Sequence, residues 1–365
     1  MKLKKNPNSI GFICASLDNM AGGLERQILR TCESFIRRGY NVFLYTYDNE
    51  GAKPFYEIPK GVKWIKCGQG LIPHSHSPIN LRLKQILFLR KRIYENSISQ
   101  LITFHHGLFP RSLAACLFLN VRLIVSERNS LSLYKYIKLN KNNLGYFSLF
   151  FANKITVQIQ AYVKDYPICL RKRIFVINNF IKKPLEKYKK PNLEKNKVAL
   201  VGRLCAQKNF QVILDKVNNY DFNHKLTIEI AGEGDLSKKY SSKYKNLIKN
   251  SILFFKGNIQ DIDSFLSDSS IFCLTSLWEG YPNSLAEALR MCLPIVVSKR
   301  FEGLNEFIEH GVNGYIVPDE EIIEKVVFLL KNKELLLRMS KESYKKYHEL
   351  YKSNPSLDWY RLINR

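Results

Sequence analysis

Two glutamates in the run 276–287 are the residues of this chain best placed to do chemistry. Glu279 lies in a turn after an apolar, strand-like run at 271–275, and Glu287 lies about one turn into the helical pattern that follows. Helices of open α/β sheets begin at the carboxyl edge of the strands, where ligands bind, so both acids can face one crevice. A carboxylate accepts two parallel hydrogen bonds, which suits the vicinal hydroxyls of a ribose or a hexose. For two isolated glutamates, a loop acid and a solvated helix acid are the simpler interpretation.

Two cations, Arg203 and Lys208, follow another apolar run at 197–201. A nucleoside diphosphate that departs during group transfer carries concentrated negative charge, and cations placed at its oxygens stabilise the transition state. The planar fork of arginine and the point charge of lysine complement each other in that role. In a chain with 57 lysine and arginine residues, two surface cations without a ligand are the alternative.

A glycine pair, Gly22 and Gly23, stands between the first apolar run and the helical pattern that begins at Leu24. A glycine turn lets the backbone approach a ligand, and the N-terminus of the following helix favours an anion. The neighbouring acid Glu25 is explained equally well by its favourable interaction with the helix dipole. The two glycines therefore carry more weight as ligand-binding positions.

Strand-like and helical runs alternate along the chain, and most of the strands are short, β-branched and apolar on both faces, as in parallel sheets. We predict strands at 9–15, 41–47, 100–104, 122–126, 154–158, 174–177, 197–201, 226–231, 253–256, 270–275, 294–298 and 314–317. Helical patterns lie between them, for example at 24–38 and 210–218. The alternation predicts an α/β fold of right-handed βαβ units in doubly wound, Rossmann-like sheets.

The length of 365 residues is sufficient for two domains, and a polar run with two prolines at 181–195 separates the two sets of strands. We predict an N-terminal Rossmann-like domain at 1–182, a linker at 183–195 and a second Rossmann-like domain at 196–345. Residues 346–365 continue a helical pattern that breaks at 353–355.

Taken together and in order, these blocks resemble the retaining, nucleotide-sugar-dependent glycosyltransferases with the GT-B fold, known as glycosyltransferase family 4 or glycosyl transferases group 1. The family's pair of glutamates separated by seven residues, written around Glu-Gly-Phe/Tyr-Pro, reads here as Glu279-Gly280-Tyr281-Pro282 followed by Glu287. Residues 201–209 match the diphosphate-binding block, and residues 22–26 match the N-terminal glycine loop. The resemblance covers roughly residues 10 to 318.

The resemblance implies a GT-B architecture, in which two Rossmann-like domains face each other across a cleft. The N-terminal domain would bind the acceptor and the C-terminal domain the nucleotide sugar, and the last helix would cross back onto the first domain. By resemblance, Glu287 binds the ribose, Glu279 binds the transferred sugar, and Arg203 and Lys208 hold the diphosphate. The implied catalytic residues are Arg203, Lys208 and Glu279, and the implied donor-binding residues add Gly22, Gly23, Gly280, Tyr281, Pro282, Asn283, Ser284, Leu285 and Glu287.

The chain departs from the family at one position near the expected cleft. Family members often carry a histidine at the end of the strand that corresponds to 122–126, but here Glu127 and Arg128 follow that strand. His106, at the end of the preceding strand, is a further candidate, although a lone histidine is more often structural than catalytic. We therefore keep Glu127, Arg128 and His106 as secondary candidates.

The formal net charge of +25 constrains the partners more than the fold. Nucleic acid, an anionic membrane and a phosphorylated substrate would each suit it, and a compositional bias toward lysine would also explain it. A clustered nucleic-acid recognition motif is missing, so no nucleic-acid partner is expected. Stretches at 83–94 and 131–154 mix apolar and basic residues, which supports the hypothesis of peripheral contact with the anionic inner membrane.

The remaining features predict a cytoplasmic enzyme without a metal. No apolar run is long enough to span a bilayer, and the short run at 10–17 lacks the length of a secretory signal. The eight cysteines include no Cys-x-x-Cys pair and are expected to be reduced. Asp261 and Asp263 have the Asp-x-Asp form of metal-dependent glycosyltransferases, but they precede a helical run and are interpreted as helix-start acids.

The resulting hypothesis is a retaining, metal-independent glycosyltransferase that needs no cofactor, because the nucleotide sugar is a co-substrate. It would move a hexose or N-acetylhexosamine from a nucleoside diphosphate, with UDP expected from the family's commonest use. The acceptor would be a hydroxyl of a lipid-linked glycan in surface polysaccharide or lipopolysaccharide synthesis. The alternatives are a GT-B nucleotide-sugar epimerase and a basic protein that binds nucleic acid or an anionic surface.

Overall fold

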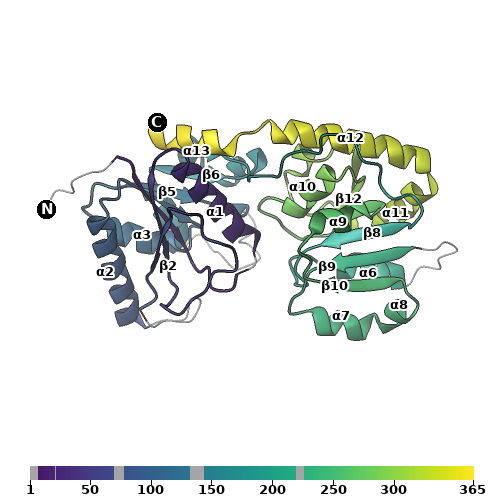
Figure 1. The fold of residues 1–365 in the computed structure, drawn as a ribbon, viewed down its shortest axis with the longest axis horizontal. Coiled ribbons are helices and arrows are strands. Elements are labelled where there is room, and N and C mark those ends of the chain that lie inside the picture. Colours follow the sequence, from purple (N-terminus) through teal and green to yellow (C-terminus); the bar gives the residue numbers. More distant parts are fainter. Residues whose placement is uncertain (1–6, 21, 70–77, 132–143, 219–225) are drawn as a thin grey trace. The chain divides into compact units, whose positions relative to one another are not determined.

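The computed structural model describes residues 7–20, 22–69, 78–131, 144–218 and 226–365 (Figure 1). The chain divides into two compact units, and each is described by itself. Unit 1 comprises Met1–Phe180 together with Asn354–Arg365, and unit 2 comprises Ile181–Ser353. Of the stretch 131–154, residues 132–143 lie outside the described residues.

Unit 1 is built on a parallel sheet with the strand order β3-β2-β1-β4-β5-β6-β7. All strand pairs of this sheet are parallel, and the order reverses direction at β1, as in doubly wound folds. The strands are β1 Ser9–Cys14, β2 Asn41–Thr46, β3 Lys63–Lys66, β4 Gln100–Phe104, β5 Arg122–Ser126, β6 Lys154–Val157 and β7 Ile174–Val176.

Helices cover the sheet of unit 1 and include the last helix of the chain. The α-helices are α1 Gly23–Ile36, α2 Ile79–Glu95, α3 Phe109–Cys116, α4 Leu144–Ser148, α5 Ile168–Arg171 and α13 Pro355–Asn364, and the 3-10 helices are η2 Leu149–Phe151 and η3 Gln160–Asp165. Trp359 and Leu362 of α13 join the buried core formed by β1 and α1. Lys154 of β6 also donates a hydrogen bond to the carbonyl oxygen of Leu362 at 2.7 Å. These contacts attach the C-terminal helix firmly to unit 1.

Unit 2 contains a second parallel sheet, with the order β10-β9-β8-β11-β12-β13. Its strands are β8 Lys197–Val201, β9 Thr227–Ala231, β10 Leu253–Gly257, β11 Ile271–Leu274, β12 Ile295–Ser298 and β13 Gly314–Val317. Its helices are α6 Gln211–Asn218, α7 Ser237–Lys243, α8 Lys245–Lys249, α9 Ile262–Ser267, α10 Asn283–Arg290, α11 Ile322–Lys331 and α12 Lys333–Tyr351, with 3-10 turns η4 Leu304–Glu306 and η5 Asp319–Glu321.

The predicted fold class is confirmed: both units are α/β with Rossmann-like parallel sheets. Every predicted strand is present, and each bound agrees within one residue. The sequence interpretation missed β3, because its sequence Lys-Trp-Ile-Lys is short, charged at both ends and half-exposed at the edge of the sheet. Among the described residues, no helix is both long enough and apolar enough to cross a membrane.

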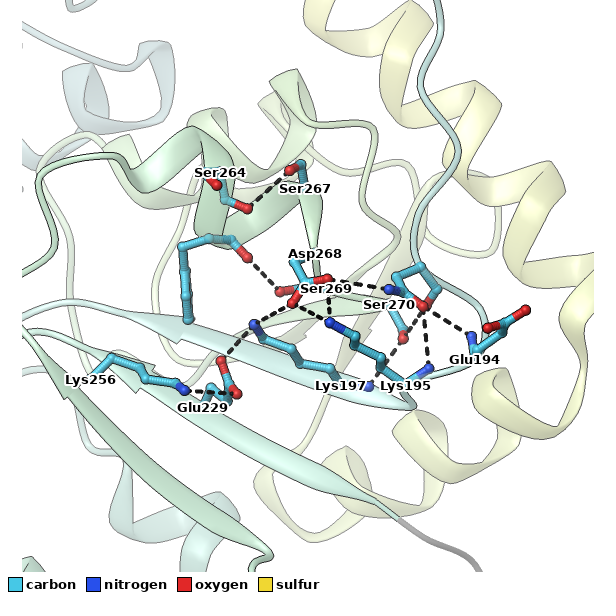
Figure 2. Close-up of polar contacts among 12 residues, drawn as sticks. Glu194, Lys195, Lys197, Glu229, Lys256, Ser264, Ser267, Asp268, Ser269 and Ser270 are labelled. Carbon is cyan, nitrogen blue, oxygen red and sulfur yellow. Dashed lines mark hydrogen bonds and ion pairs between the residues drawn. The ribbon is translucent and has the colours of Figure 1, made fainter.

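A network of charged side chains ties three strands of unit 2 together near the start of β8 (Figure 2). The ammonium of Lys197 lies 2.5 Å from one carboxylate oxygen of Glu229 on β9, and Lys256 of β10 lies 3.1 Å from the other. Asp268 accepts hydrogen bonds from Lys195 at 2.8 and 2.9 Å and lies 3.5 Å from Lys197. Burial alone would raise the pKa of Asp268, but these positive neighbours hold it below its usual value.

Candidate active site

The loops that follow β8 and β11 meet at the carboxyl edge of the unit 2 sheet, because these two strands are hydrogen-bonded neighbours. Lys208, on the loop after β8, donates from Nζ to Oε1 of Glu279, on the loop after β11, at 2.5 Å. Ser276 donates its hydroxyl to the same oxygen at 2.7 Å. The side chains of Lys208 and Glu279 are 15% and 8% exposed, so the pair is largely shielded from water.

Backbone contacts hold these two loops in register. The hydroxyl of Thr275 donates to the carbonyl oxygen of Lys208 at 2.8 Å. Gln207 donates its side-chain amide to the carbonyl oxygen of Trp278 at 2.9 Å, and its own carbonyl accepts from the N–H of Leu277 at 2.8 Å. The position of Lys208 against Glu279 is therefore fixed from both sides before any ligand binds, which is the condition for electrostatic preorganisation.

Two glycines make room for this arrangement. Gly202 has a φ of +150° and Gly232 a φ of +138°, both outside the range that L side chains readily adopt. A Cβ atom on Gly202 would lie 2.6 Å from Cε of Lys208, so the lysine stem passes directly over the glycine. A Cβ atom on Gly232 would overlap the carbonyl oxygen of Gly202. The close approach of the loops after β8 and β9 therefore requires glycine at position 232, while the φ of +150° favours glycine at position 202.

Arg203 lies on the same loop as Lys208 and is exposed. Its guanidinium makes no hydrogen bond or ion pair with any residue that the structure describes. An arginine with a rigid fork of donors at the carboxyl edge of a sheet is available for bidentate binding of a phosphate.

Helix α10 begins directly after the loop that carries Glu279. Gly280, Tyr281 and Pro282 are buried in that loop, and Tyr281 packs edge-on against Phe307 with ring centroids 5.0 Å apart. Burial raises the pKa of Tyr281, which keeps this phenol neutral. The first turn of α10 contains Asn283, Ser284 and Leu285, and Glu287 lies one turn further on, half-buried.

The start of α10 provides unused hydrogen-bond donors. N–H groups in the first turn of a helix lack an intrahelical carbonyl partner. The N–H of Asn283 already donates to the carbonyl oxygen of Tyr281 at 2.8 Å, so the donors in question are those of Ser284 and Leu285. In addition, the hydroxyl of Ser284 is buried and has no hydrogen-bond partner within the described part of the chain. A buried orphan hydroxyl beside a helix N-terminus is the arrangement that a polar or anionic ligand would complete.

In unit 1, Gly22 and Gly23 lie at the start of α1, where the sequence predicts a glycine turn. A Cβ atom on Gly22 would overlap the carboxylate of Glu25, which is only 6% exposed. The Glu25 side chain therefore folds back over the first turn and lies against Gly22, although a side chain with this freedom could move aside for a larger residue.

His106 and Glu127 form a buried pair at the carboxyl ends of β4 and β5. The ring nitrogen Nδ1 of His106 lies 3.0 Å from both carboxylate oxygens of Glu127. The backbone N–H of His106 donates to Oε1 of Glu127 at 2.9 Å. Burial alone lowers the pKa of His106, but the charge and the hydrogen bond of Glu127 outweigh it and raise the pKa. The same pair lowers the pKa of Glu127 against the opposing effect of burial. The pair therefore favours a protonated imidazole beside an ionised carboxylate.

Arg128 is held separately from this pair. Its guanidinium carbon lies 4.7 Å from the ring centroid of Phe104, and Nη1 donates to Oδ1 of Asn179 at 3.1 Å. Gln158 donates to the same oxygen at 2.6 Å. The secondary candidates therefore form two arrangements, a His106–Glu127 ion pair and an Arg128–Asn179–Gln158 cluster.

The acids of the Asp-x-Asp sequence have partners within unit 2. Asp261 caps α9 by accepting from the N–H of Ser264 at 3.0 Å. Asp263 lies 2.8 Å from both Lys182 and Arg290. Over the described ranges, no group of three or more His, Cys, Asp or Glu residues could hold a metal ion.

Comparisons with known proteins agree with this geometry. Residues 182–346 match the family Glycosyl transferases group 1. An uncharacterized glycosyltransferase of Haemophilus influenzae is 27% identical over 92% of this chain and 94% of its own length. Residues 182–346 of this chain therefore form a group 1 glycosyltransferase domain.

A second relative of this glycosyltransferase has a named activity. The GalNAc-alpha-(1->4)-GalNAc-alpha-(1->3)-diNAcBac-PP-undecaprenol alpha-1,4-N-acetyl-D-galactosaminyltransferase of Campylobacter jejuni is 23% identical, over 97% of this chain and 98% of that protein. Among solved structures, the lipopolysaccharide outer core galactosyltransferase WaaB superposes with a TM-score of 0.75 at 17% identity, covering 97% of this chain and 99% of WaaB. The fold of the glycosyltransferase is therefore GT-B.

The structure of this glycosyltransferase brings together most of the predicted donor residues. Arg203, Lys208, Glu279 and Glu287 all lie on the loops and helix at the carboxyl edge of the unit 2 sheet. The sequence interpretation did not single out Ser276, which bonds to Glu279, or Gln207, which fixes the loop backbone. Ser276 precedes Glu279 by three residues, a spacing typical of local side-chain hydrogen bonds in turns.

Proposed function

We propose that this glycosyltransferase transfers a hexose or N-acetylhexosamine from UDP to a hydroxyl of a lipid-linked glycan, with retention of configuration and without a metal. The observation that carries the proposal is the contact between Lys208 and Glu279, which sets a cation and a carboxylate side by side at the carboxyl edge of the unit 2 sheet. A donor sugar with a diphosphate at one end and hydroxyls at the other needs both kinds of group within a few ångströms.

Arg203 and Lys208 bind the diphosphate in this proposal. The negative charge that develops on the departing oxygen is stabilised by both cations, and removal of one such group typically costs about 10²–10³ in kcat. Lys208 exchanges part of its contact with Glu279 for the diphosphate. Glu279 then remains held by Ser276 and accepts hydrogen bonds from the hydroxyls of the transferred sugar.

Glu287 accepts hydrogen bonds from the ribose hydroxyls of the nucleotide, and the N–H groups at the start of α10, together with the hydroxyl of Ser284, bind the donor. In the proposed mechanism no side chain acts as a covalent nucleophile. The acceptor hydroxyl attacks the face from which the diphosphate departs, a new glycosidic bond forms, and the phosphate oxygen takes the hydroxyl proton. The protein contributes positioning and charge stabilisation.

The choice of a lipid-linked acceptor is supported by the Campylobacter jejuni relative, whose name gives an undecaprenol-linked glycan as its acceptor. Surface polysaccharide synthesis in bacteria is the corresponding setting. Such an acceptor would bring the protein to the cytoplasmic face of the inner membrane, where its basic surface meets anionic lipid.

The test is release of the nucleoside diphosphate from a panel of UDP-, GDP- and ADP-sugars, with and without bacterial membrane lipid, and with and without EDTA. We expect turnover of a UDP-sugar that requires the lipid and survives EDTA, and an α-linked product from an α-linked donor by NMR. Release that does not depend on an acceptor would favour an epimerase or a hydrolase. Loss of turnover with EDTA would overturn metal independence, and an inverted product would overturn retention.

A further inference from the structure

Helix α2 of unit 1 turns apolar side chains toward solvent. Ile79, Leu83 and Leu87 are 76%, 54% and 63% exposed and follow one another at intervals of four residues, so they share one face of the helix. Leu89 and Ile93, which point away from this stripe, are buried. A surface helix normally has one apolar face, directed at the core. Here α2 has a second apolar face, which the rest of unit 1 leaves uncovered.

The turn after α3 extends this uncovered surface. Leu117 and Phe118 are 50% and 97% exposed. Arg90 of α2 donates hydrogen bonds to the carbonyl oxygens of Leu117 at 2.6 Å and Ala115 at 3.1 Å, and α2 packs along α3 (Figure 1). These bonds fix the turn beside the helix. We define the apolar ridge as Ile79, Leu83, Leu87, Leu117 and Phe118.

Phe118 has an unusual backbone conformation. Its φ of +61° lies in the left-handed region, which a bulky side chain rarely adopts. A phenylalanine that is almost fully exposed in a strained conformation gains no packing energy to offset the strain. Strain of this kind is retained where a side chain serves an interaction outside the fold.

The apolar ridge is bordered by positive charge. Helical spacing puts Lys84 and Lys91 on one side of the ridge and Arg82 on the other, and all three are exposed. Between residues 58 and 164 the sequence contains only two acidic residues, Glu95 and Glu127.

Neither acid leaves negative charge on this surface. Glu95 lies 3.8 Å from Lys91 and 3.0 Å from Arg92, while Glu127 is 1% exposed and pairs with His106. The border of the ridge is therefore positive, and an anionic partner with an apolar interior complements it.

We propose that the apolar ridge inserts into the surface of an anionic phospholipid bilayer, an inference that rests on the lipid-linked acceptor of the proposed function. Leucine and phenylalanine side chains bury themselves at the boundary between headgroups and acyl chains, and the flanking lysines and arginines lie at the level of the phosphates. Nucleic acid would match the charge but would leave the aliphatic side chains of α2 without an apolar partner.

The test is co-flotation of the full-length protein with vesicles of phosphatidylglycerol and phosphatidylcholine, compared with vesicles of phosphatidylcholine alone. We expect binding to the anionic vesicles that weakens with salt.

The triple variant L83S/L87S/F118S should bind at least about tenfold more weakly. A matched control, F55S/I168S, removes two apolar side chains of unit 1 that are 59% and 80% exposed outside the ridge, and should bind like the wild type. Lys84→Ala should weaken binding about fivefold on anionic vesicles only.

Phe118→Gly separates an interaction role from a structural one. Glycine adopts a positive φ without strain, so this variant should have a higher Tm than the wild type and a lower affinity for vesicles. A lower Tm would show that Phe118 supports the fold, which would remove it from the ridge.

Three results would overturn the proposal. The first is a wild-type protein that does not float with anionic vesicles at low salt, and the second is a triple variant that floats as well as the wild type. The third is a wild-type dimer that the triple variant converts to a monomer in light scattering, with unchanged flotation, because the ridge would then join two copies of the chain. Donor turnover with a water-soluble glycan acceptor is measured in parallel. Turnover without flotation contradicts only the ridge, whereas flotation without turnover contradicts only the proposed function.

Discussion

Unit 2 contains two lysine–glutamate pairs with the same separation but different surroundings. Lys197 and Glu229 lie 2.5 Å apart near the start of β8, and Lys208 and Glu279 lie 2.5 Å apart beyond its end. The first pair joins side chains of adjacent strands. Its glutamate is shared with a second lysine, Lys256 (Figure 2). The second pair joins two loops and lies on the same edge of the sheet as the exposed Arg203.

The comparison shows that the edge of the sheet, rather than the pair itself, decides the role. A buried ion pair contributes little net stability, but breaking one by removing a single partner is costly because a charge stays buried alone. For Lys197 and Glu229, the cost of breaking the pair holds adjacent strands in place, which is a structural role. Between loops at the carboxyl edge, the same cost holds two opposite charges in place, and in the proposed function they meet a ligand that carries both phosphates and hydroxyls.

The largest expected effect is on catalysis by the loop pair. Lys208→Met should lower kcat with the cognate UDP-sugar by about 10²–10³, because the diphosphate loses one of its two cations. The measurement is steady-state release of UDP, accompanied by the Tm. A variant that is folded and fully active would contradict the role of this pair.

The matched substitution in the strand pair should affect stability instead. Lys197→Met leaves Glu229 paired with Lys256 alone, so the free energy of unfolding should fall by about 1–2 kcal/mol, with kcat unchanged in the folded fraction. Urea unfolding measures this loss. The double variant K197M/E229L should recover most of it, and a failure to recover would mean that packing rather than charge is responsible.

A third variant tests the start of α10. Ser284→Ala removes a buried hydroxyl that has no partner within the described residues, so the unfolding free energy should stay the same or rise. If the hydroxyl binds the donor, KM for the UDP-sugar should rise about five- to tenfold while kcat changes little. An unchanged KM would remove Ser284 from the donor site.

The smallest expected effect is the acid response of the strand network. Because its pKa in the folded protein is below the ordinary value, Asp268 contributes stability that is fully present above the unfolded pKa of about 3.9. That contribution is lost as the pH falls through the lower, folded pKa. Urea unfolding of the wild type and of Asp268→Asn between pH 5 and pH 3 should converge toward the acid end. Curves that stay parallel would contradict the pKa shift.

The sequence predicts the strands of both units because they are short, apolar and β-branched between clear helical patterns. It cannot predict β3, whose two lysines and edge position give no apolar run. Glu279 and Lys208 are candidates because the blocks around them resemble the glycosyltransferase family, but their contact depends on the pairing of β8 with β11, which no local pattern reveals.

The charged network at Lys197 is also invisible in the sequence. A lysine at the start of a strand and a glutamate within another are usually solvated, but here both are mostly buried, and the ring of Phe265 in α9 lies 4.6 Å from the ammonium of Lys197. The pairing of His106 with Glu127 is likewise not visible in the sequence. The two residues follow strands that are adjacent in the sheet but are separated by a helix in the chain.

The most direct test of the central claim is donor binding by the loop pair. Isothermal titration of UDP should be measured with the wild type, Lys208→Met and Lys197→Met, each confirmed to be folded by circular dichroism. The account predicts that UDP binds to the wild type and to Lys197→Met with similar Kd, and about tenfold or more weakly to Lys208→Met. Equal affinity for all three proteins, or weaker binding only in Lys197→Met, would contradict the assignment of the donor site to the carboxyl edge of the unit 2 sheet.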